Sequence, residues 1–293
     1  MTVRRRRIDV GGVALAVTDS GPPRAAVPGL PSAQSGRAQL PVVVLHGFTG
    51  SAASMSGVAA ALAGRWRTLC VDLVGHGASD APDDVAAYAM DAVVGQLAAL
   101  LDALAIPRAH WLGYSMGGRT ALCFAAAHPG RVASLLLVGA SAGLAQADER
   151  AARVAADEAL ARSIERDGVE AFVERWLALP LFASQARLGP AALAAARAQR
   201  LDNRAHGLAN SLRGMGTGAQ APQHARLARI DAPVCLVVGA GDEKFDGIAR
   251  DLARRLPDAR IERIDGAGHA AHLEAPVAFA GVANAFVREC EAP

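Results

Sequence analysis

The feature that most constrains the fold is a short apolar run ending in a glycine-rich turn, which recurs along the chain. It appears first as PVVVLHGF at residues 41–48 and returns at 67–77, 109–118, 132–140, 232–242 and 259–269. Helical patterns, such as those at 87–105 and 117–127, lie between these runs. Continuous apolar strands that alternate with helices predict a mostly parallel central sheet with helices on both faces. In such a sheet the ligand crevice lies beyond the carboxyl ends of the strands.

The alternation stops at residues 141–213, which are rich in Ala, Arg and Glu and have a helical period. We interpret this segment as a helical cap inserted between a first core part (1–140) and a second core part (214–293). Residues 20–40 are rich in Pro, Gly, Ala and Ser and predict an exposed loop. The N-terminal sequence MTVRRRRIDVGGVALAV resembles a targeting signal, but Asp9 and the glycine pair 11–12 interrupt its apolar part. A β-hairpin turning at these glycines is the preferred interpretation.

Composition narrows the class of partner. A net charge of +2 without a basic face, and 4% aromatic residues, argue against nucleic acid. No apolar run is long enough to span a membrane. The four cysteines form no CxxC pair and no zinc-like cluster with histidine. We expect Cys70 and Cys235 to be small core residues in a reducing, cytoplasmic compartment, and we expect neither a metal nor a cofactor.

The motif that carries chemistry is GYSMG at residues 113–117, which matches G-x-S-x-G. It follows an apolar strand and precedes a helical segment, which is the setting of a nucleophile elbow. In that turn Ser115 is held in a strained conformation, and side chains at Gly113 or Gly117 would clash. The alternative is a glycine-rich turn with a chance serine.

A nucleophilic serine needs a base, and the base needs a carboxylate to orient it. In this arrangement the acid follows a late strand and the histidine follows the last one, which selects Asp242 and His269. Other carboxylates in the same region are Glu243, Asp246 and Asp265, and His272 is the rival base.

The sequence LHGFTG at residues 45–50 ends an earlier strand. We expect the backbone N–H groups of Phe48 and Met116 to form an oxyanion hole there, with His46 bracing the loop. We interpret His76 as part of the loop architecture. Together these motifs resemble the α/β-hydrolase fold over nearly the whole chain outside residues 20–40. The fold alone leaves the reaction open, because it serves many unrelated chemistries.

A more specific resemblance comes from SLRGMGTGAQ (211–220), GDEKF (241–245) and GAGHAAHLEAP (266–276). Combined with the motifs at His46, Val71 and Gly113, these segments resemble the 2-succinyl-6-hydroxy-2,4-cyclohexadiene-1-carboxylate synthases of menaquinone biosynthesis. The resemblance implies a lyase that abstracts a proton and eliminates pyruvate, without an acyl-enzyme. Ser115, activated by His269 and Asp242, would act as the base.

The substrate of that family is a small polycarboxylate, so its site needs fixed cations, and arginine suits planar carboxylates. Arg119 lies one helical turn after Ser115, where we expect it at the mouth of the pocket. By resemblance, Arg153 and Arg200 would also bind carboxylates, and Tyr114 and Trp176 would line the site. For the two cap arginines a solvated helix face is the alternative.

Two other functions remain open. A serine hydrolase acting on an ester or a C–C bond would keep the triad and need no arginine cluster. A non-catalytic binding protein is the second alternative. The glycine run at 207–220 is not a phosphate loop, because no strand precedes it and no lysine or Ser/Thr pair follows. It predicts the end of a cap helix that leads into a glycine turn.

Overall fold

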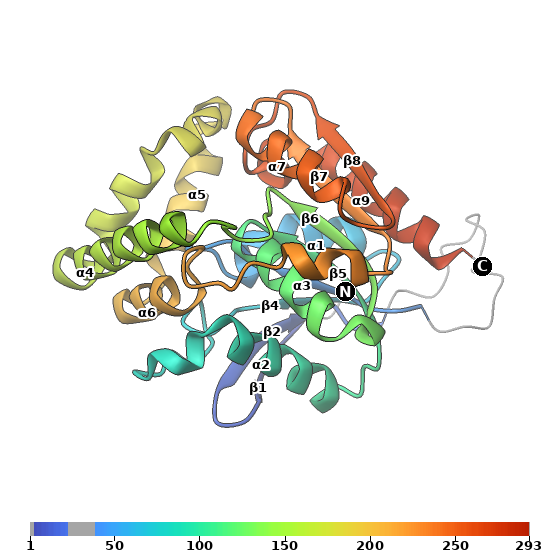
Figure 1. Cartoon of the computed structure of the whole chain (residues 1–293), viewed down its shortest axis with the longest axis horizontal. Coiled ribbons are helices and arrows are strands. Elements are labelled where there is room, and N and C mark those ends of the chain that lie inside the picture. Colours follow the sequence, from blue (N-terminus) through green and yellow to red (C-terminus); the bar gives the residue numbers. More distant parts are fainter. Residues whose placement is uncertain (1–2, 23–38, 293) are drawn as a thin grey trace.

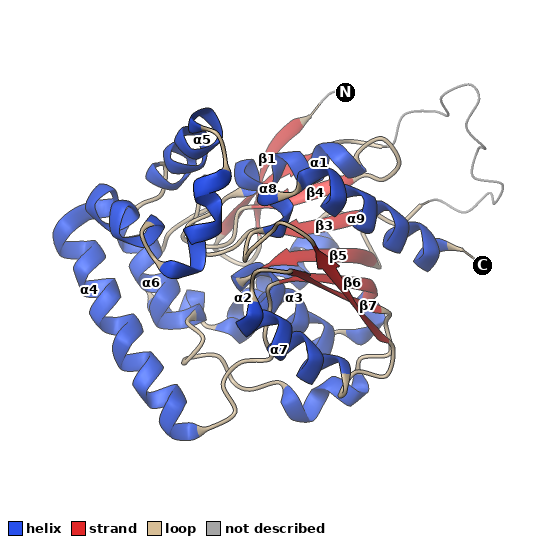
Figure 2. Cartoon of the chain, turned by 90° about the horizontal axis from the view of Figure 1, so that it is seen from above, coloured by secondary structure: helices blue, strands red, loops and turns tan. Residues whose placement is uncertain are grey.

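The computed structural model describes residues 3–22 and 39–292 and is built around one twisted sheet (Figures 1 and 2). Its strand order is β1-β2-β4-β3-β5-β6-β7-β8. The strands are β1 (Arg4–Asp9), β2 (Ala14–Asp19), β3 (Val42–Leu45), β4 (Thr68–Val71), β5 (Ala109–Tyr114), β6 (Val132–Val138), β7 (Val234–Gly239) and β8 (Ala259–Ile264). From β4 to β8 all neighbours are parallel, so the predicted sheet is confirmed.

The predicted N-terminal hairpin is also confirmed. β1 and β2 pair antiparallel, and Gly11 and Gly12 turn the chain with φ angles of 95° and 91°. These angles lie in the left-handed region, which glycine enters without steric cost. β2 then pairs antiparallel with β4 and joins the hairpin to the parallel strands. Most of the loop expected at 20–40 lies outside the described residues.

Side chains alternate between the two faces of the sheet, so each face has its own apolar core. One core lies under α2 (Met90–Ala103), α3 (Met116–Ala127) and α7 (Glu243–Ala253). The other lies under α1 (Ser56–Leu62) and α9 (Pro276–Glu291), with the short α8 (Ala271–Glu274) beside it. Cys70 and Cys235 belong to the second core, as expected.

The inserted cap lies to one side of the sheet, at the left of Figures 1 and 2. It consists of α4 (Ala147–Leu177), a 3₁₀ segment at Pro180–Arg187, α5 (Pro190–Leu201) and α6 (Ala205–Met215), and it has a small apolar core of its own. Gly168, with φ 82° and ψ 169°, interrupts α4. The expected boundary at residue 213 is slightly early, because α6 continues to Met215.

Helix α6 holds the cap against the sheet domain. A methyl group on Gly207 would collide with the backbone of Gly75, and one on Gly214 with the backbone of Tyr88. Glycine therefore allows the helix to approach these backbones closely. Asn210 adds hydrogen bonds from its amide nitrogen to the carbonyls of Pro82 and Asp83, at 3.4 and 3.3 Å.

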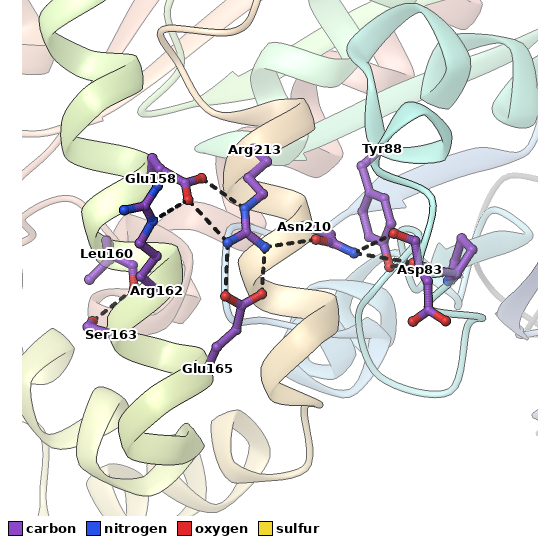
Figure 3. Close-up of polar contacts among 10 residues, drawn as sticks. Asp83, Tyr88, Glu158, Leu160, Arg162, Ser163, Glu165, Asn210 and Arg213 are labelled. Carbon is purple, nitrogen blue, oxygen red and sulfur yellow. Dashed lines mark hydrogen bonds and ion pairs between the residues drawn. The ribbon is translucent and has the colours of Figure 1, made fainter.

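Arg213 joins α6 to α4 (Figure 3). Its guanidinium donates to Glu158 at 2.9 Å and to both carboxylate oxygens of Glu165, at 2.5 and 2.9 Å. Both glutamates are on the N-terminal part of α4, before Gly168. The arginine of the glycine-rich run is thus part of the scaffold, and the run is the end of a cap helix, as predicted.

Candidate active site

Ser115 occupies the turn between β5 and α3 in a strained backbone conformation, with φ 52° and ψ −109°. Glycine makes the turn possible on both sides. A methyl group on Gly113 would collide with the backbone of Gly117, and one on Gly117 would lie 2.5 Å from the carbonyl oxygen of Leu45. Ser115 occupies the N-cap position of α3, where the helix dipole favours negative charge, and its side chain makes no capping hydrogen bond. The predicted strand–turn–helix geometry is therefore present.

His269 and Asp242 complete a hydrogen-bonded chain with this serine. His269 Nε2 lies 3.1 Å from Ser115 Oγ, and His269 Nδ1 lies 2.8 Å from Asp242 Oδ2. Asp242 Oδ1 also accepts the backbone N–H of Phe245, which fixes the carboxylate at the start of α7. With the Nδ1 proton held by Asp242, Nε2 is free to accept the hydroxyl proton of the serine.

The other candidates for the acid and the base do not take part in the hydrogen bonds of the triad. Asp246 is bound by Arg250 and by Arg263, the latter at 2.7 Å. Glu243 and Asp265 are exposed. His272 packs against the ring of Tyr114, with centroids 4.4 Å apart, and is not bonded to Ser115.

One buried histidine, His76, and one half-buried histidine, His272, make the folded state sensitive to acid. Burial lowers the pKa of His76 to about 3, helped by the nearby His46, and burial lowers the pKa of His272 to about 3, helped by His269 and Arg200. The unfolded chain therefore binds these protons first as the pH falls below about 6.5. The stability that the neutral rings contribute is complete above that pH and is lost progressively below it.

We therefore expect the free energy of unfolding to fall by about 1.4 kcal/mol per pH unit for each of these histidines below about pH 6.5. Urea unfolding of the wild type and of His76→Gln and His272→Gln, at pH 7, 6 and 5, measures this slope. Each substitution should reduce the slope of the free energy of unfolding against pH by the contribution of one histidine. Parallel slopes in all three proteins would contradict the expectation.

The loop after β3 lies beside Ser115, where the oxyanion hole is expected. Met116 is the first residue of α3, so its N–H has no acceptor within the helix. Phe48 lines the same cavity as Ser115 and Met116. His46 braces the loop, as predicted: its Nε2 accepts the N–H of Leu73 at 3.0 Å, and its Nδ1 donates to the carbonyl of Gly47 at 2.8 Å.

A cavity of about 360 Å³ opens at Ser115, between the sheet domain and the cap. The residues predicted for the site that line it are Phe48, Tyr114, Ser115, Met116, Arg119, Arg153, Trp176 and His269. Trp176 packs edge-on against Phe48, with ring centroids 5.3 Å apart, and its buried Nε1 has no hydrogen-bond partner among the described residues. The cap therefore supplies an aromatic wall opposite the nucleophile.

Arg119 lines this cavity but lies deeper than expected, since it is 9% exposed and not at the mouth. Its guanidinium donates to Gln220 Oε1 at 2.5 Å and to the carbonyl of Met215 at 2.9 Å. Burial lowers its pKa to about 10, so it remains a cation at neutral pH. The end of the glycine-rich run thus holds the arginine in place.

The two cap arginines are separated by the structure. Arg153 lines the Ser115 cavity and pairs with the buried Asp157 at 2.8 Å. Arg200 instead lines a neighbouring cavity of about 320 Å³, together with His272, and donates to the carbonyl of Ala196. The structure therefore does not bring Arg200 to the cavity where it was expected.

Sequence reasoning missed several polar residues that line or support the cavity, among them Gln220 and Lys244. Gln220 holds Arg119, and no local pattern could indicate a partner about a hundred residues away in the chain. Lys244 lines the cavity itself. Its position two residues after Asp242 was the signal that could have identified it.

In the described part of the chain, no helix is both long and apolar enough to cross a membrane.

Comparisons with known proteins agree with this geometry. A family model described as alpha/beta hydrolase fold matches residues 41–276. A Bacillus subtilis (strain 168) protein with the provisional name 2-succinyl-6-hydroxy-2,4-cyclohexadiene-1-carboxylate synthase is 41% identical over 94% of this chain and 95% of its own length. A Serratia proteamaculans (strain 568) protein named as the same synthase is 32% identical over 87% of this chain and 96% of its own length.

Solved structures include MenH from S. aureus, which is 30% identical with a TM-score of 0.84, covering 89% of this chain and 97% of that one. A thermophilic esterase from Thermogutta terrifontis has a TM-score of 0.81 at 24% identity, covering 99% of this chain and 100% of that one. At that identity the esterase is evidence for the fold alone.

Proposed function

Because the chain belongs to the α/β-hydrolase fold family, and within it to the 2-succinyl-6-hydroxy-2,4-cyclohexadiene-1-carboxylate synthases, we propose that it is a lyase of menaquinone biosynthesis. It eliminates pyruvate from 2-succinyl-5-enolpyruvyl-6-hydroxy-3-cyclohexene-1-carboxylate. The observation that carries this proposal is that a complete hydrogen-bonded Ser–His–Asp triad lies at a cavity that Arg119 and Arg153 also line. A substrate with three carboxylates needs such cations, whereas a neutral ester does not.

In the proposed mechanism Ser115 Oγ is the base. His269 Nε2 accepts the hydroxyl proton of Ser115, and Asp242 stabilises the imidazolium that forms. Oγ takes the ring proton next to the succinyl carbonyl, and the N–H groups of Phe48 and Met116 stabilise the enolate-like oxygen. The enolate electrons then form a new double bond in the ring, the existing ring double bond shifts by one position, and the bond between the ring carbon and the enolpyruvyl oxygen breaks. The released group is the enolate of pyruvate, which takes up a proton at its terminal carbon and becomes pyruvate.

The direct test supplies this substrate to the purified protein. Pyruvate release and the appearance of the diene absorbance should occur together, in equal amounts, and faster than the spontaneous elimination measured without protein. A rate equal to the spontaneous one would refute the proposal. A chromogenic ester tested in parallel would reveal a dedicated serine hydrolase if its hydrolysis reached rates typical of such enzymes.

Arg119 should contribute strongly to this reaction. Substituting it by alanine removes a buried cation from the cavity, so we expect transition-state stabilisation to fall by roughly 2–4 kcal/mol, measured as kcat/KM. Because Arg119 also bonds to Met215 and Gln220, thermal unfolding of the same variant separates a loss of stability from a loss of catalysis. A kcat/KM close to that of the wild type would show that Arg119 does not bind the substrate.

We also propose that the protein acts in the cytoplasm. Its proposed partner is the small-molecule substrate, and neither nucleic acid nor a membrane is proposed as a partner. The state of the cysteines supports a reducing compartment. All four belong to the described residues and none forms a disulfide.

A further inference from the structure

Lys244 is the only lysine in the chain; the other residues counted among its 30 Lys and Arg are all arginine. It lies in the first turn of α7, two residues after Asp242. There it lines the same cavity as Ser115 and His269. The one ammonium group carried by a side chain thus belongs to the candidate active site.

The surroundings of Lys244 leave its positive charge available to bind an anionic ligand. Among the described residues no carboxylate lies within 4 Å of its ammonium group, and Asp246 on the same helix is already bound by Arg250 and Arg263. Its Nζ lies 5.9 Å from the centroid of the Phe245 ring. That ring in turn packs against His269, with centroids 4.4 Å apart.

The other cations near the cavity are already engaged. Arg119 donates to Gln220 and Met215, and Arg153 is paired with Asp157. Two carboxylates also line the cavity: Asp251, which pairs with the two arginines that directly follow α7, and Glu149. Within the described part of the chain, Lys244 is therefore the arginine or lysine of the cavity lining that has neither an ion-pair partner nor a hydrogen-bond partner.

The number of charges on the proposed substrate gives this lysine a role. That molecule carries three carboxylates, on the ring, the succinyl chain and the enolpyruvyl group. Of the three arginines expected to bind them, Arg200 lines a different cavity. We propose that Lys244 is the third carboxylate-binding cation of the Ser115 cavity. This inference rests on the proposed function for the identity of the substrate.

A lone lysine allows a test on the unmodified protein. Sulfo-N-hydroxysuccinimide acetate acetylates accessible amines, and peptide mass spectrometry reports the extent at Lys244. Succinate or pyruvate at about four times its Kd should slow this acetylation about fivefold, because about 80% of the sites would then be occupied. The uncharged esters diethyl succinate and methyl pyruvate should leave it unchanged. Equal rates with and without the carboxylates would overturn the proposal.

Kinetics provide the second measurement. Lys244→Gln should raise KM for the proposed substrate about ten- to fiftyfold, the loss of one charge-assisted hydrogen bond, with little change in kcat. Lys244→Arg should recover most of the affinity. The matched control is Arg250→Gln, which removes one positive charge from the same helix outside this cavity and should leave KM unchanged. If both glutamine variants raise KM equally, the effect is general electrostatics and the proposal fails.

A purely structural role gives a different pattern. If Lys244 only supported Phe245 against His269, Lys244→Met would lower kcat and change its pH profile at constant KM, which would refute carboxylate binding. The proposed function is judged separately. Turnover by the wild type without carboxylate protection refutes the role of Lys244 alone. Protection without turnover refutes the proposed reaction and retains Lys244 as a carboxylate site.

Discussion

Replacing Ser115 with alanine is expected to reduce kcat about 10⁴-fold, the scale on which catalytic triads lose activity when the nucleophile position is removed. In the proposed elimination Ser115 Oγ takes the substrate proton, so its loss leaves His269 without the group that it activates. Pyruvate release under saturating substrate measures the effect. KM should change little, because the cations that bind the carboxylates remain.

The double variant Ser115→Ala/His269→Ala separates this mechanism from simpler ones. Residues that act as one unit are not additive, so the double variant should be about as slow as Ser115→Ala alone. If the fold-losses in kcat of the two single variants multiply in the double variant, His269 acts on the substrate independently of Ser115. Near-normal turnover in Ser115→Ala would exclude the serine as the base.

Gly117→Ala is expected to destabilise the fold by about 4 kcal/mol and to lower Tm by about 10 °C. The added methyl group would lie 2.5 Å from the carbonyl oxygen of Leu45 and 2.6 Å from that of His46. Neither atom can move without shifting β3 and the loop that carries Phe48. Activity should therefore fall together with stability. Calorimetric unfolding of the variant measures the change.

The matched control is Gly281→Ala on the exposed side of α9, where an added methyl group meets no atom within 4 Å. Alanine is the better helix former, so this variant should gain up to about 1 kcal/mol. A similar Tm in the two variants would mean that close packing at the elbow is not what requires glycine at position 117.

Much of the architecture could be predicted because its signals are local. Each parallel strand is an apolar run that ends in a glycine turn, and the hairpin is marked by Gly11 and Gly12. The elbow could be located because the serine needs small neighbours on both sides, and the order of acid and histidine follows from the fold. These constraints act within a few residues of one another in the chain.

The parts that could not be predicted depend on distant contacts. Arg119 was placed correctly near the nucleophile, but its depth depends on Gln220 and on the end of α6, about a hundred residues later. The spacing of Arg153 and Arg200 gave no indication that they line different cavities. Which face of a cap helix meets the cavity is decided by the packing of the cap on the sheet.

The interruption of α4 at Gly168 has a consequence for how specificity could be redesigned. The part before it is fastened to α6 by Arg213 and carries Arg153, whereas Trp176 and the segment up to Leu201 follow the break. Glycine suits this point, because its φ of 82° would strain other residues. A combinatorial library confined to residues 169–201 would therefore vary the aromatic wall of the cavity while keeping its anchored cation, which makes this segment the natural module for new substrates.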